Sequence, residues 1–430
     1  MQIDAALGAG ENLKGLVSQP RAAEAAAEGT YVPFTEVDIR TSVRPTVAEI
    51  DLGAVQRNLV RVRAAVGRDV AIYGVVKADA YGHGAVPVAR ALEPLCNALA
   101  VSLVEEGLEL RAAGIRAPIV VLGAYYGGHH DDVLAERLTP VVYDGGDLDR
   151  FADAAGRRGR RAEVHVKVDT GMSRLGIDAR ELAGTLARAR GLVGVRLAGL
   201  CTHFASADVP DPSATREALA RFELCLAEAR RAGFEGIVRH AANSAAAVRF
   251  PEARLDAVRP GLALYGAMPS RNVPLPGLEP ALRLSTRIMA VHDVPTGTGV
   301  SYGGLWRAGR PSRIATLPVG YADGYPRHVQ RAEALVAGRR VPVVGAVCMD
   351  MLMVDVTDVP PAVAGLGDAV TLIGRDGPEE ITVDDLAGWA GTINYEILCG
   401  ISKRVPRILR DAPVTPPAAG PPPPRAKPAP

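Results

Sequence analysis

Two lysines stand at the ends of apolar, strand-like runs in a chain that otherwise takes its positive charge from arginine. The 430 residues include 49 Lys or Arg, and only five of these are lysines: Lys14, Lys77, Lys167, Lys403 and Lys427. Lys77 ends the run AIYGVVK (71–77). Because burial disfavours the charged form of an amine, a lysine against apolar walls has a lowered pKa and can form a Schiff base with a carbonyl compound. Lys77 is therefore a candidate nucleophile, the alternative being a solvated surface lysine.

Other polar residues also stand at the ends of apolar runs further along the chain. Lys167 and Asp169 end the run 162–169, and His203 ends the run 196–204. Asn243 and Ser244 follow the run 237–242, and Arg259, Pro260 and Gly261 close the run 256–261. Each has a structural interpretation when taken alone, such as a core histidine or an ion-pair partner. Together they predict that the carboxyl ends of these strands lie side by side and that the residues there carry out the chemistry.

A phosphate group fits the residues at the end of this series. Ser244 offers a hydroxyl and a backbone N–H, Gly261 permits close approach of the backbone, and the amide of Leu262 can also donate. Tyr81, four residues after Lys77, could reach the same anion through its hydroxyl. A Schiff-base lysine opposite a phosphate site fits pyridoxal 5′-phosphate.

Arg259 is expected near the ring nitrogen of such a cofactor. An arginine does not give up its proton in proteins, so it cannot protonate that nitrogen. An unprotonated ring is a weaker electron sink than one paired with Asp or Glu. The residue therefore favours simple proton exchange at Cα over reactions that need a long-lived carbanion.

The elements that must position these residues alternate between strands and helices. Short apolar runs are separated by amphipathic stretches such as SLVEEGLELRAAG; the runs are 71–77, 98–102, 118–123, 139–143, 162–169, 196–204, 237–242 and 256–261. Eight such units predict an α/β fold, a (β/α)8 barrel of the TIM type, whose active site lies at the carboxyl ends of the strands. The competing open, doubly wound sheet is weakened because no GxGxxG follows the first strand.

The expected domains follow from changes in residue pattern along the chain, from apolar runs alternating with amphipathic stretches to short β-branched runs separated by glycine and proline. We expect the barrel over 45–282, with the strand at 45–52 joining a mostly-β domain at 283–410, and a helix at about 54–66. One helix-like segment at 384–401 is expected to close the ordered chain. We expect residues 1–44 to form a flexible extension. Residues 411–430 contain nine of the 33 prolines, and we expect them to form a disordered tail.

Composition excludes several other classes of protein. A net charge of +1 gives no electrostatic case for binding nucleic acid or a membrane surface, and no apolar stretch is long enough to span a bilayer. The five cysteines are scattered without a CxxC pair, so neither a disulfide framework nor a metal site is expected. A cytoplasmic protein without a signal peptide is the expectation.

A set of motifs resembles the bacterial alanine racemase family, whose members are fold-type III pyridoxal-phosphate enzymes. The resemblance covers roughly residues 45–409. Its motifs are VVKADAYGHG (75–84), HVKVDTGMSRLG (165–176), CTHFASAD (201–208), RHAANSAA (239–246), AVRPGLALYG (257–266), VSYGGLW (300–306), VGYADGYPR (319–327), AVCMDMLMVDVT (346–357) and INYEILCGISKRVPR (393–407).

The resemblance implies a homodimer that interconverts L- and D-alanine, supplying D-alanine for peptidoglycan. Lys77 would hold the cofactor and act as the base for the D-enantiomer. Tyr302, supplied by the second subunit, would act on the opposite face for the L-enantiomer. A tyrosine has a pKa near ~10, and His203 and Arg259 would form the relay that poises it.

The resemblance also implies roles for the remaining candidates. Arg174 would contact the cofactor's phenolic oxygen and the substrate carboxylate, and Lys167 would carry a carbamate that holds Arg174 in place; its alternative is an unmodified lysine paired with Asp169. Further expected contacts are Tyr81 and Tyr395 to phosphate, the Met349 amide and the Asp350 side chain of the partner to the substrate carboxylate, and Tyr321 on the path of the substrate. For Tyr321 and Tyr325 the alternative is aromatic packing.

Three other functions remain open from the sequence. A fold-type III amino-acid decarboxylase is disfavoured because Arg259, not an acid, is expected at the ring nitrogen. A single-barrel pyridoxal-phosphate carrier is disfavoured because such carriers lack the C-terminal domain that bears Tyr302. The sequence barely distinguishes an alanine racemase from a racemase of broader specificity that acts on serine or larger amino acids, because the volume of the substrate pocket depends on loop geometry.

Overall fold

The computed structural model describes residues 44–123, 128–270 and 272–410. The expected N-terminal extension, apart from its last residue, and the expected proline-rich tail lie outside these ranges. Among the described residues, no helix combines the length and apolar character needed to cross a membrane.

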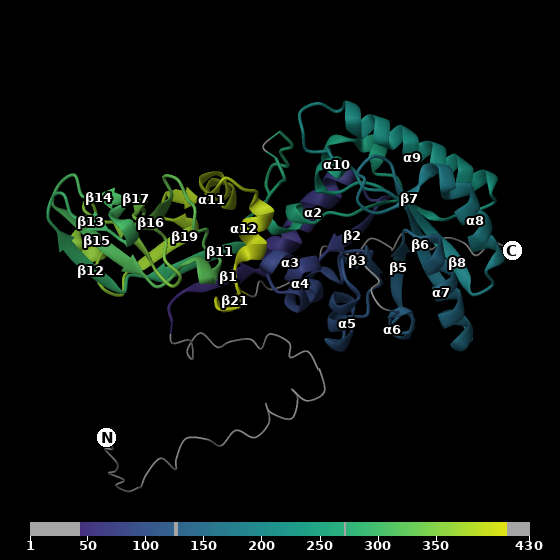
Figure 1. The fold of residues 1–430 in the computed structure, drawn as a ribbon, viewed down its shortest axis with the longest axis horizontal. Helices are drawn as coiled ribbons and strands as arrows, with labels where there is room; N and C mark the ends of the chain where they lie inside the picture. The colour runs from purple at the N-terminus through teal and green to yellow at the C-terminus, as the bar shows by residue number, and fades with distance from the viewer. Residues whose placement is uncertain (1–43, 124–127, 271, 411–430) are drawn as a thin grey trace, which may run out of the picture. The chain divides into compact units, whose positions relative to one another are not determined.

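The first part of the chain forms a closed parallel barrel (Figure 1). The order of neighbouring strands is β5-β4-β3-β2-β10-β9-β8-β6, and pairing of β5 with β6 closes the ring. All eight predicted strands form, which confirms the predicted fold class. Their bounds are β2 Ala71–Val75, β3 Ala98–Val101, β4 Ile119–Val121, β5 Leu138–Val142, β6 Ala162–Asp169, β8 Val195–Cys201, β9 Val238–His240 and β10 Ala257–Val258, with the short β7 Ile177–Asp178 paired to β6.

Helices cover the outside of this barrel, and the longer ones turn an apolar face toward the strands. In α9 (Ser213–Arg231), the buried side chains include Phe222 and Leu226, one turn apart, while the charged residues point outward. The other helices of this part are α2 Leu52–Val66, α3 Lys77–Gly82, α4 Ala85–Leu92, α5 Val104–Ala112, α6 His130–Ala135, α7 Gly145–Arg157, α8 Leu182–Gly191 and α10 Ser244–Arg249.

The later part of the chain is built on a sheet in the order β12-β15-β18-β17-β16-β19-β11-β1-β21, with β20 paired to β19. Its bounds are β11 Leu282–Arg287, β12 Ala290–Val294, β15 Ser312–Leu317, β16 Glu333–Val336, β17 Arg339–Val344, β18 Leu352–Asp355, β19 Ala369–Asp376, β20 Glu379–Ile381 and β21 Arg407–Arg410. Strands β13 Gly299–Val300 and β14 Trp306–Arg307 form a separate hairpin. The mostly-β character expected here is confirmed.

Strand β1 (Val47–Asp51) precedes the barrel in sequence but pairs with strands of the later sheet. It is antiparallel to β11, with Val47 opposite Ser285, and parallel to β21, with Ala48 opposite Arg407. Asp51 then caps helix α2 by accepting a hydrogen bond from the Ala54 amide at 2.8 Å. The helix therefore begins at Leu52, slightly before the predicted residue 54.

The prediction of one closing helix at 384–401 is wrong in two respects. Two helices form instead, α11 (Val383–Ala390) and α12 (Asn394–Gly400), separated at Gly391, whose φ of 68° ends the first helix in a left-handed cap. The ordered chain then continues into β21, which the sequence did not predict.

Candidate active site

A left-handed turn follows Lys77, shortly after the end of strand β2. Ala78, Asp79, Ala80 and Tyr81 have φ values of 52°, 53°, 52° and 55°, and none of them is a glycine. Left-handed helical backbone costs about 1–2 kcal/mol for each L-residue. The turn is therefore strained, and neighbouring groups must hold it.

Asp79, within the turn, and His83, just after it, hold the backbone of the turn. Asp79 accepts a hydrogen bond from the Ala85 amide at 2.6 Å. The Nδ1 of His83 lies 3.0 Å from the carbonyl oxygens of Ala80 and Tyr81. Because both partners are acceptors, Nδ1 must carry the proton, and complete burial of the ring lowers the pKa of His83 to about 4. His83 therefore supports the turn as a neutral imidazole.

Tyr81 leaves this turn as part of a group of aromatic rings. Its ring centroid lies 5.0 Å from that of Tyr265 and 5.8 Å from that of Tyr395, which comes from α12. The Tyr81 hydroxyl lies over Gly261, where an added Cβ would meet it at 2.4 Å. The Oγ of Ser244 accepts hydrogen bonds from the amides of Gly261 at 3.0 Å and of Ala263 at 3.4 Å. Two hydroxyls thus meet at a backbone segment that only glycine permits.

Asn243 and Leu262 frame the same segment. The Asn243 side chain caps helix α10 by accepting from the Ala246 amide at 3.0 Å. Leu262 is buried and begins the short 3-10 helix Leu262–Tyr265, directly after Gly261. The residues predicted from strands seven and eight therefore lie together.

Arg259 is buried in the barrel. Within the described part of the chain, no carboxylate is among its hydrogen-bond partners. It donates to the carbonyls of Thr202 at 2.8 Å and Ala241 at 2.9 Å, and contacts Nδ1 of His240 at 2.5 Å and Nδ1 of His203 at 3.3 Å. Burial lowers the pKa of Arg259 from its ordinary value. Burial also lowers the pKa of His203, to well below the ordinary value of a histidine. The guanidinium charge is stabilised by neutral dipoles alone.

The chain of contacts continues behind Arg259 through two histidines. His240 Nε2 lies 2.8 Å from Nδ1 of His165. Because Arg259 can only donate, Nδ1 of His240 must accept, so its Nε2 carries the proton and donates to His165. Burial and the nearby Arg259 charge lower the pKa of His165 to about 4. Both rings are therefore neutral, with their tautomers set by Arg259.

The two candidate lysines have lowered pKa values for the same main reason. Burial lowers the pKa of Lys77, and the Arg174 charge lowers it further. Burial likewise lowers the pKa of Lys167, which lies opposite Cys201 in the barrel sheet. Asp169, the partner in the alternative interpretation of Lys167, accepts instead from the amides of Gly171 at 2.8 Å and Met172 at 2.9 Å.

The remaining candidates belong to the later domain and form a second group. Tyr302 lies in the 3-10 turn Tyr302–Gly304 with its side chain 76% exposed, and Met349 is 52% exposed. The two loops are neighbours, since the Oγ of Ser301 donates to the Ala346 carbonyl at 2.8 Å. Asp350 forms an ion pair with Arg404 at 2.7 Å.

The two tyrosines of the GYADGY motif have different environments. Tyr321 is partly exposed and lies under the guanidinium of Arg327, 6.0 Å from its ring centroid. Tyr325 is fully buried, and its hydroxyl has no hydrogen-bond partner within the described ranges. Burial in the core supports the packing interpretation for Tyr325, while the role predicted for Tyr321 stays a prediction.

The structure thus brings the barrel candidates together and leaves the second group apart. No hydrogen bond, ion pair or ring contact among the described residues joins Tyr302, Met349 or Tyr321 to Lys77. Sequence reasoning did not single out four residues of the barrel group: His83, Glu106, Tyr265 and His240. The histidines and the tyrosine lie inside motifs that were quoted, but Glu106 has no sequence signal beyond its place as the third residue of a helix.

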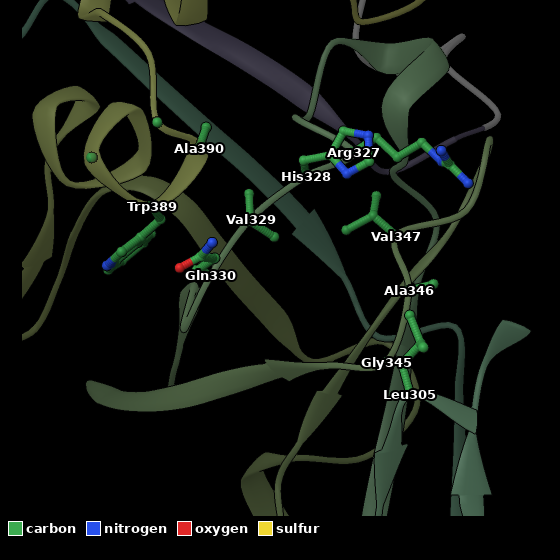
Figure 2. A pocket seen from close by; sticks show the side chains of 12 residues that line it. Leu305, Arg327, His328, Val329, Gln330, Gly345, Ala346, Val347, Trp389 and Ala390 are labelled. Atoms are coloured by element: carbon green, nitrogen blue, oxygen red, sulfur yellow. The ribbon is translucent and has the colours of Figure 1, made fainter. Parts of the chain in front are cut away.

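A cavity of about 440 Å³ lies in the later domain, beside the second group (Figure 2). Trp389 and Gln330 border it on one side and the segment 345–347 on the other. Leu305, near Tyr302 in sequence, also lines it. The cavity is lined by later-domain residues alone, so it is distinct from the barrel group around Lys77.

The fold and the barrel group define a two-domain barrel enzyme with a half-buried lysine just after the first barrel strand. Comparisons with known proteins identify the family within this class. The family model "Alanine racemase, N-terminal domain" matches residues 50–269, and "Alanine racemase, C-terminal domain" matches residues 281–409. The chain belongs to the alanine racemase family, which confirms the resemblance seen in the motifs.

Relatives and solved structures agree with this assignment. An alanine racemase from Symbiobacterium thermophilum is 48% identical over 85% of this chain and 97% of its own length, and one from Halothermothrix orenii is 45% identical over 86% and 97%. The structure of an alanine racemase from Streptomyces lavendulae has a TM-score of 0.82 at 37% identity, covering 86% of this chain and 98% of that one. The structure of an alanine racemase from Bacillus anthracis, with bound L-Ala-P, has a TM-score of 0.80 at 40% identity, covering 86% of this chain and 96% of that one.

Proposed function

We propose that this protein interconverts L- and D-alanine with pyridoxal 5′-phosphate. The observation that carries the proposal is the convergence of Lys77, Tyr81, Ser244, Gly261 and Arg259 in the barrel of a chain from the alanine racemase family. The residues fit the cofactor: the Tyr81 and Ser244 hydroxyls and the bare backbone of Gly261 suit a phosphate. Tyr395 lies beside Tyr81, and Asn243 and Leu262 frame the same segment.

The chain's own residues would direct the chemistry as follows. Pyridoxal phosphate, when bound, supplies an electron sink that makes the Cα–H bond of an amino acid easier to ionise. Arg259, whose side-chain partners are carbonyls and histidines, would face the ring nitrogen without supplying a proton to it, which would favour proton exchange over decarboxylation. Lys77, whose pKa is lowered by burial and by Arg174, would hold or move the proton on one face of Cα.

The second base would come from another subunit. We propose a homodimer in which Tyr302 of the partner subunit faces Lys77, with His203 and Arg259 poising its hydroxyl. Tyr302, Leu305 and Met349 are exposed on two neighbouring loops, which supports an interface, because clustered exposed apolar residues often mark association sites. The Met349 amide, Asp350 and Tyr321 of the partner would then border the substrate, opposite Arg174.

Lys167 would carry a carbamate in this arrangement. Only a neutral amine takes up carbon dioxide, and burial lowers the pKa of Lys167 in the direction that supplies one. A carbamate would be an anion and would attract Arg174 where an ammonium repels it. Growth with ¹³C-bicarbonate should give a carbamate carbon signal that Lys167→Arg removes; an unlabelled wild-type protein would contradict the assignment.

The test of function uses the purified full-length protein. Lys77→Ala should abolish the visible absorbance of bound pyridoxal phosphate, while Lys403→Ala, at an exposed lysine, should not. Tyr302→Phe should keep the absorbance and slow deuterium exchange at Cα of L-alanine more than of D-alanine. Absorbance without exchange at alanine would refute the racemase, and exchange at serine of equal rate would favour the broader racemase. The cytoplasmic location stays a prediction.

A further inference from the structure

One carboxylate joins the ends of two neighbouring barrel strands beside Lys77. The Oε1 atom of Glu106 accepts a hydrogen bond from the Ala78 amide at 2.6 Å. Its Oε2 atom accepts from the amides of Ser102 at 2.7 Å and Leu103 at 3.0 Å. Ala78 follows β2, whereas Ser102 and Leu103 follow β3. Glu106 itself lies in the first turn of α5, so three elements meet at its side chain.

The bond to Ala78 fixes the peptide group that immediately follows Lys77. Ala78 is the first residue of the left-handed turn, where the backbone leaves the direction of β2. Hydrogen bonds to an ionised acceptor are among the strong ones in proteins. Asp79 and His83 hold the later part of the turn, but Glu106 is the side chain that holds its beginning. The direction of the Lys77 side chain therefore depends on this carboxylate.

The charge of Glu106 also acts on the Lys77 amine. The groups that affect the pKa of Lys77 are Arg174, which lowers it, and Glu106 and Cys399, which raise it against the larger effect of burial. Arg174 comes from the loop after β6, Glu106 from α5 and Cys399 from α12. Of the two that raise the pKa, Glu106 is the carboxylate. It therefore limits how far burial and Arg174 can lower the proton affinity of the amine.

We propose that Glu106 is a positioning residue for Lys77, whose carboxylate holds the start of the left-handed turn and whose charge opposes that of Arg174. The inference rests on the proposed function, in which the Lys77 amine moves the proton at Cα. Glu106 itself touches backbone amides, so its effect on the reaction passes through Lys77.

The experiment compares Glu106→Gln with Glu105→Gln in the full-length chain without pyridoxal phosphate. Glu105 is the exposed neighbour on the same helix, so both variants lose one negative charge. The first readout is acetylation of lysine amines as a function of pH, followed by mass spectrometry with exposed Lys403 as the internal reference. Glu106→Gln should move the half-labelling pH of Lys77 down by on the order of one unit. Glu105→Gln should leave it in place.

The second readout is hydrogen exchange at the amides of residues 78–81. Loss of a hydrogen bond to a charged acceptor should speed exchange at Ala78 by about tenfold or more. If Glu106→Gln matches Glu105→Gln in both readouts, the proposal is overturned. A fall in thermal stability with an unmoved labelling profile and unmoved exchange would mean a general structural role and would also overturn it.

A second variant keeps the test decisive if Glu106→Gln does not fold. Glu106→Asp retains the charge but is shorter by one methylene, so exchange at Ala78 should rise while the half-labelling pH of Lys77 moves less than a few tenths of a unit. Wild-type exchange in this variant would contradict the proposal. Neither readout uses substrate or cofactor, so a chain that lacks racemase activity would still give an answer about Glu106.

Discussion

The left-handed turn after Lys77 predicts that a glycine should stabilise the protein where it usually weakens one. Ala78 has a φ of 52° and is exposed, so Ala78→Gly removes little buried surface. The change relieves about 1–2 kcal/mol of left-handed strain. Against this, glycine raises the entropy of the unfolded chain, at a cost of about 0.4–1 kcal/mol. The net change in the free energy of unfolding is therefore an increase of zero to roughly 1.5 kcal/mol.

The matched control is Ala187→Gly, at an exposed position in the ordinary right-handed helix α8. Here the same substitution should destabilise by about 0.5–1 kcal/mol. For a chain of this size, 1 kcal/mol corresponds to roughly 1 °C in Tm. Differential scanning calorimetry should therefore show Ala78→Gly at or above the wild-type Tm and Ala187→Gly below it.

The measurement is best made without pyridoxal phosphate, because a bound ligand would add its own stabilisation. Equal losses of Tm in the two variants would refute the reasoning, since they would mean that the left-handed backbone carries no strain that glycine can relieve. A gain in Tm with a loss of racemase activity would show instead that the strained turn serves the site.

Two further predictions concern the phosphate segment and the buried histidines. Gly261→Ala would place a Cβ 2.4 Å from the Tyr81 hydroxyl, and overpacking of about 1–3 kcal/mol should raise the Kd for pyridoxal phosphate by roughly tenfold or more; Gly184→Ala, in open space on helix α8, should leave that Kd unchanged. The pKa values of His83 and His165 are lowered to about 4 by burial, so the unfolded chain binds protons first on acidification. Stability should therefore be full above pH ~6.5 and fall progressively toward pH 4, by on the order of 1 kcal/mol per pH unit for each histidine; urea titrations that show no such decline would contradict their neutral burial.

The barrel strands were predictable because each is an apolar run that ends in polar residues, and a closed barrel brings those ends together. Lys77, Ser244 and Arg259 could be placed at one rim for that reason. The left-handed turn could not be predicted, since the residues that adopt it, ADAY, contain no glycine to signal a positive φ. It is held by a tertiary contact from Glu106 and by local hydrogen bonds of Asp79 and His83.

Other features depended on partners that are distant in sequence. Strand β21 escaped prediction because RILR is short and mixes charge with apolar residues, and its pairing with β1 joins the two ends of the described chain. The break between α11 and α12 depends on the backbone of Gly391, which a helix can also tolerate in its interior. The separation of Tyr302 from Lys77 likewise follows from tertiary structure and not from either motif.

The place of β1 in the later sheet has a consequence for how the protein is made. The strand ends at Asp51, but its neighbour β11 begins at Leu282, so a ribosome adds about 230 residues between them. At roughly 5–20 residues per second, β1 waits on the order of 10–45 s for its first sheet partner and longer for β21. Throughout that time the nascent barrel carries an unpaired strand whose Val47, Ala48 and Ile50 are buried only in the finished sheet. Chaperone binding to the nascent chain should therefore begin at β1 and end only when β11 has emerged.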